Sequence, residues 1–147
     1  GYHSNPKLAG IKHCNRLEQI LARSDLSSDE AIMLDEKKNV VSVTQGNIYL
    51  IFGNKLLTPK LDRCGVVGSR RSLILELARS LKMDALESNI SINQAQQADE
   101  VFISNSVIGI QPVHAIESHK LGQNPLTEKI QKAFLTKAQE SSSWTCP

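Results

Sequence analysis

The stretch "EAIMLDEKKNVVSVTQGNIYLIFGNKLLTP", residues 30–59, decides the fold. Its apolar runs are short, are rich in β-branched and aromatic residues, and are interrupted by polar turns such as "EKKN" and "GN". Runs of this length, separated by turn residues, are typical of strands rather than helices. We therefore predict three or four strands in this stretch, paired as an antiparallel meander.

Helical spacing of apolar residues occurs on both sides of this strand region. A short helix is predicted within residues 14–26, and a second helix is predicted to open at Ser69. A third is expected over residues 124–140, with Pro125 near its first turn. Further strands are predicted in "ESNISI", "VFISNS" and "IGIQPVHAIE", with a helical turn in "NQAQQADE". Because strands and helices do not alternate regularly, we expect an α+β fold rather than a doubly wound sheet.

The composition argues against several classes of protein. The 147 residues have a formal net charge of +2, too small to indicate nucleic acid or an acidic membrane as a partner. No apolar run approaches the roughly 20 residues that span a bilayer. The three cysteines, Cys14, Cys64 and Cys146, are widely spaced and form no CxxC. Neither a disulfide framework nor a metal site is therefore expected, and a reducing cytoplasm is the predicted compartment.

Three segments carry residues that can do chemistry, and each also has an ordinary interpretation. Lys12, in "GIKHCNRLEQIL", is either a solvated lysine or an amine at the mouth of a pocket, ready to form a Schiff base. "GVVGSRRS", residues 65–72, is either an ordinary helix entry or a phosphate-binding loop with free N–H groups. Ser106, in "SNSVIGIQPV", belongs either to a polar turn or to a second anion contact.

Polar residues also occur inside the strand region, where they need partners from the backbone or from a ligand. They are Ser42, Thr44, Gln45 and Asn47. The adjacent His13 and Cys14 are not interpreted as a catalytic pair, because neighbouring side chains point apart on a helix or a strand.

Taken in order, these segments resemble the class IV pyridoxal-phosphate aminotransferase family. "NPKLAGIKHCNRLEQILARS" is similar to the family's lysine segment, and "QADEVFISNSVIGIQPV" to its second phosphate contact. The resemblance implies that residues 1–147 form the large cofactor-binding domain, a mostly antiparallel sheet or pseudo-barrel with flanking helices. A C-terminal helix and tail would occupy residues 122–147. The family's smaller N-terminal domain, which closes the site, is expected to be absent from this chain.

The resemblance also implies roles for individual residues. Lys12 would form the Schiff base with pyridoxal 5'-phosphate and carry protons, and Val66 would pack against the cofactor ring. The backbone amides of Ser69 and Arg70 would hold the phosphate, helped by Ser106.

Position 42 departs from the family's pattern, which has a glutamate there that pairs with the pyridine nitrogen. The sequence has Ser42, whose hydroxyl does not hold the pyridinium proton as a carboxylate does, so either a weakened electron sink or a neutral ring is expected. The lysine segment favours a lyase that converts 4-amino-4-deoxychorismate into 4-aminobenzoate and pyruvate in folate biosynthesis, as a homodimer. The alternatives are a class IV aminotransferase acting on branched-chain or D-amino acids, and a non-catalytic remnant of the fold.

Overall fold

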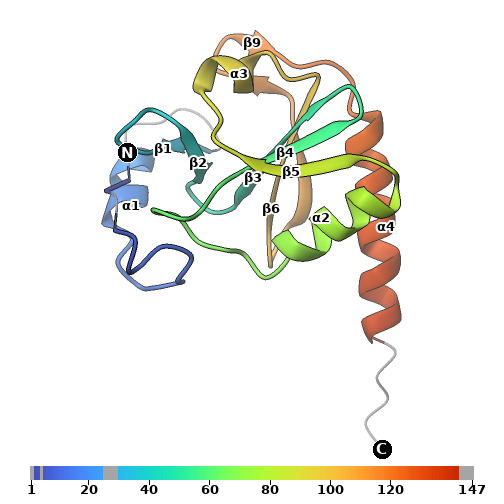
Figure 1. Ribbon diagram of the computed structural model, residues 1–147, viewed down its shortest axis with the longest axis horizontal. Coiled ribbons are helices and arrows are strands. Elements are labelled where there is room, and N and C mark those ends of the chain that lie inside the picture. Colours follow the sequence, from blue (N-terminus) through green and yellow to red (C-terminus); the bar gives the residue numbers. More distant parts are fainter. Residues whose placement is uncertain (1, 4, 25–29, 143–147) are drawn as a thin grey trace, which may run out of the picture.

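The computed structural model describes residues 2–3, 5–24 and 30–142 and is built around a five-stranded sheet of order β5-β4-β3-β6-β7 (Figure 1). Its strands are β3 (Asn47–Phe52), β4 (Lys55–Pro59), β5 (Asp84–Ser88), β6 (Glu100–Asn105) and β7 (Gly109–Val113). Neighbouring strands are antiparallel except β4 and β5, which are parallel. The sheet is open, with β5 and β7 at its edges, so the described residues form a mostly antiparallel sheet and no closed barrel.

Residues 30–59 form four strands, as predicted, but the single meander is wrong. β1 (Ile32–Leu34) and β2 (Val40–Val43) make a hairpin of their own, and β3 and β4 make a second hairpin within the central sheet. Only one bridge, between Val43 and Gly46, connects β2 to the approach to β3 in the described part of the chain. The physical reason is that β4 and β6 flank β3, so no edge of β3 remains for β2.

Helices and small elements cover both faces of the central sheet. Figure 1 shows α2 (Arg71–Ser80) beside the C-terminal helix α4 (Pro125–Ser142) on one side, and α3 (Ile92–Gln96) with the β8–β9 pair at the opposite end. The small elements β8 and β9 span Ala115–Ile116 and His119–Lys120, and α1 spans Leu17–Ser24. The predicted helices are thus all present. The tail after α4, with Cys146, lies outside the described residues.

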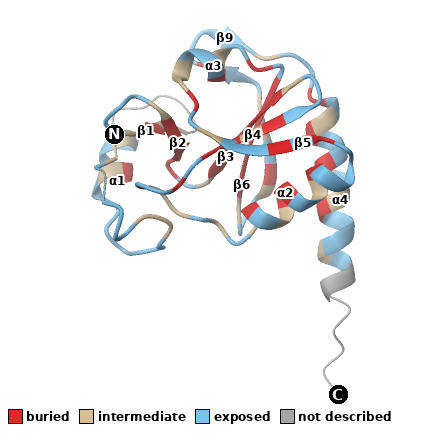
Figure 2. Ribbon diagram, viewed as in Figure 1, coloured by how far each residue is buried: buried red, intermediate tan, exposed pale blue. Residues whose placement is uncertain are grey.

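The alternating side chains of β3 divide the core into two clusters. Figure 2 shows that buried residues are concentrated along the central strands. Tyr49 and Ile51 are fully buried on the face that α2 and α4 cover, while Ile48 and Leu50 are buried on the face toward β2 and α3. Successive residues of a strand point to opposite faces, so a strand buried on both faces reads as a continuous apolar run. This explains why "NIYLIF" shows no polar alternation.

Two element boundaries differ from the sequence prediction. The helix expected to open at Ser69 begins at Arg71, with Arg70 as its N-cap residue. The strand expected over residues 87–92 ends at Ser88, because Ser91 opens α3 instead. There the Ser91 hydroxyl accepts from the backbone N–H of Gln94, and the Gln94 side chain accepts from the N–H of Ser91. Such a reciprocal pair satisfies two N–H groups that the first turn leaves unpaired.

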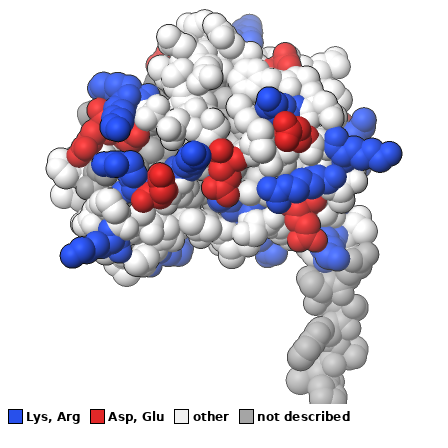
Figure 3. All heavy atoms as spheres, viewed as in Figure 1, with Lys and Arg blue, Asp and Glu red and all other residues white. Residues whose placement is uncertain are grey.

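The surface combines mixed charge with one open apolar face. Lysine, arginine, aspartate and glutamate side chains are interspersed on the side that Figure 3 shows. Within the described part of the chain, no helix is long and apolar enough to cross a membrane. On α1, by contrast, Leu17, Ile20 and Leu21 are exposed by 60%, 63% and 59%. This helix therefore lies on the molecule without burying its apolar face.

Candidate functional site

A cavity of about 720 Å³ brings together residues that lie far apart in the sequence. Its lining comes from the lysine segment and α1, the end of β2, the start of β3, the loop before α2 and the turn after β6. The sequence-predicted site residues all line it: Lys12, Ser42, Val66, Ser69, Arg70 and Ser106. The antiparallel pairing of β3 with β6 explains part of this convergence, because Asn47 at the start of β3 faces Ser104 near the end of β6.

The lysine segment is bonded to the loop that precedes α2. Gly10 forms a parallel bridge with Val66: the N–H of Gly10 donates to the carbonyl of Gly65 at 2.9 Å, and the N–H of Val67 donates to the carbonyl of Gly10 at 3.2 Å. Lys12 follows two residues later, is exposed, and has no hydrogen-bond or ion-pair partner among the described residues. Its amine is free to react with a molecule in the cavity.

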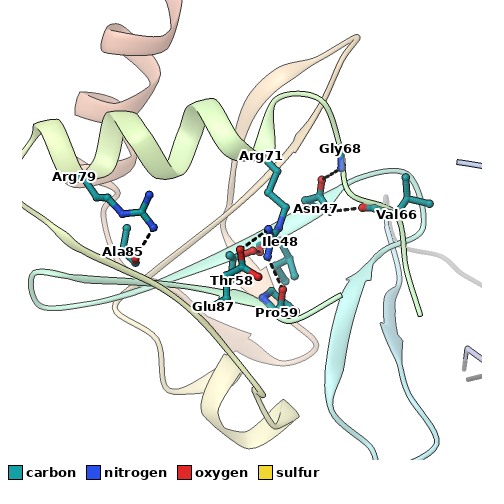
Figure 4. A network of polar contacts seen from close by, with 10 residues as sticks. All are labelled: Asn47, Ile48, Thr58, Pro59, Val66, Gly68, Arg71, Arg79, Ala85 and Glu87. Carbon is teal, nitrogen blue, oxygen red and sulfur yellow. Dashed lines mark hydrogen bonds and ion pairs between the residues drawn. The ribbon is translucent and has the colours of Figure 1, made fainter. Parts of the chain in front are cut away.

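Asn47 positions the loop of residues 65–68 with both atoms of its amide. Its Nδ2 donates to the carbonyl of Val66 at 2.9 Å, and its Oδ1 accepts from the N–H of Gly68 at 3.1 Å (Figure 4). Gly68 has to be glycine, because a Cβ there would collide with Asn47 Oδ1. The sequence indicated Asn47 as a strand residue in need of partners but did not indicate this task.

The start of α2 is open toward the cavity. Arg70, the N-cap residue, has helical φ and ψ, and its side chain makes no capping hydrogen bond. No acidic residue follows it in the first turn. Among the described residues, the N–H groups of Ser69 and Arg70 have no acceptor. Unpaired N–H groups at the positive end of a helix attract anions. The site therefore has the donors that a phosphate needs.

The two arginines at this helix start have different surroundings. The guanidinium of Arg70 lies over the ring of Phe134, with 5.4 Å between its Cζ and the ring centroid. Arg71 is 5% exposed and points away from the cavity into the sheet, where it bonds Glu87 Oε1 at 2.9 Å and the carbonyl of Pro59 at 2.8 Å (Figure 4). Arg71 does not line the cavity, and both of its terminal guanidinium nitrogens are bonded within the fold, so it offers no positive charge to an anion bound there.

The turn that carries Ser106 is held by the residue before it. Asn105 Oδ1 accepts from the N–H groups of Val107 and Ile108, at 2.9 and 2.8 Å, and its Nδ2 donates to the carbonyl of Gln45 at 3.0 Å. Ser106 itself is exposed and lines the cavity. The side chain of one asparagine thus fixes the turn and attaches it to the loop that enters β3.

Ser42 lies deep in the wall of the cavity and is 4% exposed. Its hydroxyl donates to the hydroxyl of Tyr2 at 3.3 Å, and the same Tyr2 oxygen accepts from Gln19 Nε2 at 2.9 Å. No carboxylate bonds Ser42 in the described structure. Ser42 was predicted from the sequence, whereas Tyr2 and Gln19 were missed because their contact with it depends on the tertiary fold.

These features fit the expected cofactor, a phosphorylated pyridine aldehyde. A lysine amine, an apolar side chain, an uncapped helix start and a buried hydroxyl occur in one cavity, supplied by Lys12, Val66, α2 and Ser42. An anion offsets the unpaired positive end of α2, which has no partner among the described residues. The residues present therefore suit pyridoxal 5'-phosphate.

Comparison with known proteins identifies the family. Residues 2–116 match the model of the class IV aminotransferases. The aminodeoxychorismate lyase of Vibrio harveyi is 34% identical over 116 residues, which are 77% of this chain and 43% of that protein. A branched-chain-amino-acid aminotransferase of Pseudomonas aeruginosa is 32% identical over 110 residues, 73% of this chain and 36% of that protein.

The chain is also similar to a solved structure. The crystal structure of 4-amino-4-deoxychorismate lyase from Pseudomonas aeruginosa superimposes with a TM-score of 0.84 and 40% identity, over 89% of this chain and 50% of that one. The chain thus spans about half the length, or less, of the proteins that it matches. It belongs to the class IV aminotransferases, a pyridoxal-phosphate-dependent enzyme family that includes both aminodeoxychorismate lyases and branched-chain aminotransferases.

Proposed function

We propose that this chain is the cofactor-binding domain of a lyase that converts 4-amino-4-deoxychorismate into 4-aminobenzoate and pyruvate. One observation carries the proposal: Lys12, Ser42, Val66, the start of α2 and Ser106 line a single cavity. Resemblance to the family had assigned a cofactor contact to each of them. The greater identity to a lyase structure, 40% against 28% for the Escherichia coli branched-chain aminotransferase, supports the choice of reaction.

The proposed chemistry divides between the cofactor and the chain. Pyridoxal phosphate supplies an aldehyde that reacts with amines and a ring that accepts electrons. Lys12 Nζ would hold the cofactor through its aldehyde carbon and would carry the proton that leaves the substrate carbon bearing the amine. The N–H groups of Ser69 and Arg70 and the Ser106 turn would orient the phosphate, and Val66 would pack against the ring. The enolpyruvyl group would leave with its ether oxygen and take up a proton to become pyruvate, and formation of the aromatic product would supply driving force.

Reductive trapping tests the cofactor site directly. The chain is incubated with pyridoxal phosphate, reduced with borohydride and digested, and the modified lysine is found by peptide mass. We expect the label on Lys12 and its loss in Lys12→Ala. Lys7→Ala is the matched control, because Lys7 is an exposed lysine of the same segment that does not line the cavity. Label scattered over surface lysines would contradict the proposal and favour a non-catalytic remnant of the fold.

A class IV aminotransferase is the second candidate, and the 32% identity to a branched-chain aminotransferase supports it. The two reactions share the cofactor site and differ in products. Formation of 4-aminobenzoate and pyruvate from 4-amino-4-deoxychorismate would support the lyase, whereas conversion of branched-chain or D-amino acids to keto acids would replace it with the aminotransferase.

We further propose that the enzyme works as a homodimer, in the cytoplasm, in folate biosynthesis. The family's smaller domain would close the cavity in the complete enzyme. The apolar face of α1 supports this proposal. Its leucine and isoleucine side chains are more than half exposed, and an exposed apolar face of this kind is expected to be covered by another protein surface. Sedimentation equilibrium of the chain tests the dimer, and a monomer at all concentrations would count against it.

A further inference from the structure

Arg16 directly precedes α1 and is tied by one nitrogen to the end of β2. Its Nη2 donates to the carbonyl of Thr44 at 2.9 Å. Thr44 is itself held in place, because it is 3% exposed and its N–H donates to the carbonyl of Ala31 at 3.0 Å. Arg16 lines the cavity, and Thr44 does not. The guanidinium is thus anchored at one corner, while the side chain borders the cavity.

The rest of the Arg16 fork has no partner in the part of the chain that the structure describes. A guanidinium carries five N–H donors, and the bond to Thr44 uses one of them. No carboxylate among the described residues pairs with Arg16. A planar fork with free donors binds a carboxylate through two parallel hydrogen bonds, which the ammonium of a lysine does not do. Arg16 therefore offers the cavity an anion-binding group.

The charges around the cavity favour an acidic ligand. Among the described residues, its lysine and arginine side chains are Lys12, Arg16 and Arg70, against the single carboxylate of Glu18. A cavity lined mainly by one sign of charge attracts ligands of the opposite sign. The proposed function assigns Lys12 to the cofactor aldehyde, and the guanidinium of Arg70 lies over the ring of Phe134. Arg16 is therefore the cation that remains for a second ligand.

The substrate of the proposed reaction carries an anion at a fixed place. In 4-amino-4-deoxychorismate the ring carboxylate lies across the six-membered ring from the amine, and 4-aminobenzoate keeps both groups. Because the ring is rigid, an amine held at the cofactor places this carboxylate at one distance from it. The second carboxylate, on the enolpyruvyl ether, turns about single bonds and leaves with pyruvate. A fork that is anchored at one corner suits the rigid group better, because less freedom is lost on binding.

We infer that Arg16 binds the ring carboxylate of the substrate and so selects cyclic amino acids whose carboxylate lies opposite the amine. This rests on the proposed function, which places the substrate amine at the cofactor beside Lys12. Arg16 takes no part in the proton transfer and instead orients the ring from its far side. The carbonyl of Thr44 positions the fork for this contact.

A matched pair of ligands tests this contact without any turnover. 4-Aminobenzoate and 4-aminobenzamide have the same ring and the same amine, but only the first carries a carboxylate. The full chain is loaded with pyridoxal phosphate, and both ligands are titrated by isothermal titration calorimetry. We expect the wild type to bind the acid about tenfold or more tightly than the amide, as hydrogen bonds between two charged groups predict. Arg16→Met should bind the two ligands about equally.

Two further variants separate this contact from a general effect of charge. Arg16→Lys keeps the charge and loses the fork, so its preference for the acid should be intermediate. Arg23→Met removes an arginine of α1 that does not line the cavity, and it should keep the wild-type preference. The dissociation constant for pyridoxal phosphate itself should be the same in the wild type and in Arg16→Met, because the contact is made to the substrate.

The outcomes distinguish this inference from the proposed function. If borohydride labels Lys12 but the wild type does not prefer the acid, the inference is wrong and the cofactor site stands. The inference is equally wrong if Arg16→Met keeps the preference, or if it weakens both ligands alike, since Arg16 would then only tie α1 to β2. A weaker affinity for pyridoxal phosphate in Arg16→Met would assign Arg16 to the cofactor and also overturn it. If no cofactor is trapped on Lys12, the proposed function fails and the inference fails with it.

Discussion

Gly10 and Val66 form a parallel β-bridge that fixes the lysine segment against the loop before α2. Gly10 has a φ of +79°, a conformation that other residues rarely adopt, and it uses both its N–H and its carbonyl in this contact. The backbone thus sets the distance between Lys12 and the helix start, although the two segments are far apart in the sequence. This backbone contact brings the lysine and the loop before α2 to the same cavity.

Gly65 is predicted to be essential to this arrangement. Its φ is +89°, and a Cβ there would lie 2.7 Å from Val41 Cγ1 and 2.8 Å from Leu61 Cδ2. Gly65→Ala should lower the free energy of unfolding by about 2–4 kcal/mol, from backbone strain and overpacking together. Denaturant titration measures this loss. Gly122→Ala is the control, because no atom lies within 4 Å of its added Cβ and its φ is not positive; equal losses in both variants would contradict the prediction.

Asn47→Asp is predicted to weaken cofactor binding rather than the fold alone. The change replaces the donor to the Val66 carbonyl with a charged oxygen while keeping the acceptor for Gly68. The repulsion should displace the loop that presents Ser69 and Arg70, at a cost of about 1–3 kcal/mol. The dissociation constant for pyridoxal phosphate, measured by absorbance titration, should rise by about tenfold or more.

Asn54→Asp provides the comparison for Asn47→Asp. Asn54 Nδ2 also donates to a backbone carbonyl, that of Lys82 at 2.8 Å, but it is exposed and does not line the cavity. The substitution should leave cofactor affinity unchanged. If both variants bind the cofactor like the wild type, the Asn47 amide has no part in positioning the loop.

Local sequence signals predicted where the strands and helices lie better than they predicted which strands pair with each other. The run "NIYLIF", the turn at Gly53 and "KLLTP" became the β3–β4 hairpin, and Pro125 is the first residue of α4. The separate β1–β2 hairpin and the parallel pairing of β4 with β5 were missed. Pairing depends on which strand edges remain free, and that is decided by segments such as β6, which is distant from β3 along the chain.

The candidate site, too, was predicted only in part. Resemblance to the family named the residues that line the cavity, whereas the residues that hold them in place came from the structure. Asn47 carried a usable signal, since a buried polar residue in an apolar run needs partners. Tyr2 carried none, because its contact with Ser42 joins residues 40 positions apart and depends on the packing of the first residues against β1 and β2.

The Arg71–Glu87 pair should make stability depend on pH. Hydrogen bonding to Arg71 is the main cause that lowers the pKa of Glu87 below its ordinary value of 4.5. A lowered pKa stabilises the folded state above the unfolded value, and that contribution disappears as the pH falls through the lowered folded value. Because the Glu87 side chain is 46% exposed, we expect a coupling of about 1 kcal/mol or less at neutral pH.

A double-mutant cycle measures this coupling. Arg71→Met, Glu87→Gln and the double variant are compared with the wild type by denaturant titration at neutral pH and again in acid, below the lowered pKa of the Glu87 carboxyl. The coupling should be present at neutral pH and vanish in acid. A value that is the same at both pH values would show that the ion pair does not stabilise the protein.

Glu100→Gln should destabilise the attachment of α4 to the sheet. Glu100 is 4% exposed, and its two carboxylate oxygens accept from the N–H groups of Leu126 and Thr127, at 2.9 and 2.7 Å. The substitution removes the negative charge at the positive end of the helix and replaces one acceptor with a donor. We expect a loss of about 1–3 kcal/mol in the free energy of unfolding, measured by denaturant titration. Glu76→Gln, on the exposed side of α2, should change it by less than about 0.5 kcal/mol. Equal effects in the two variants would mean that the Glu100 charge does not hold the helix.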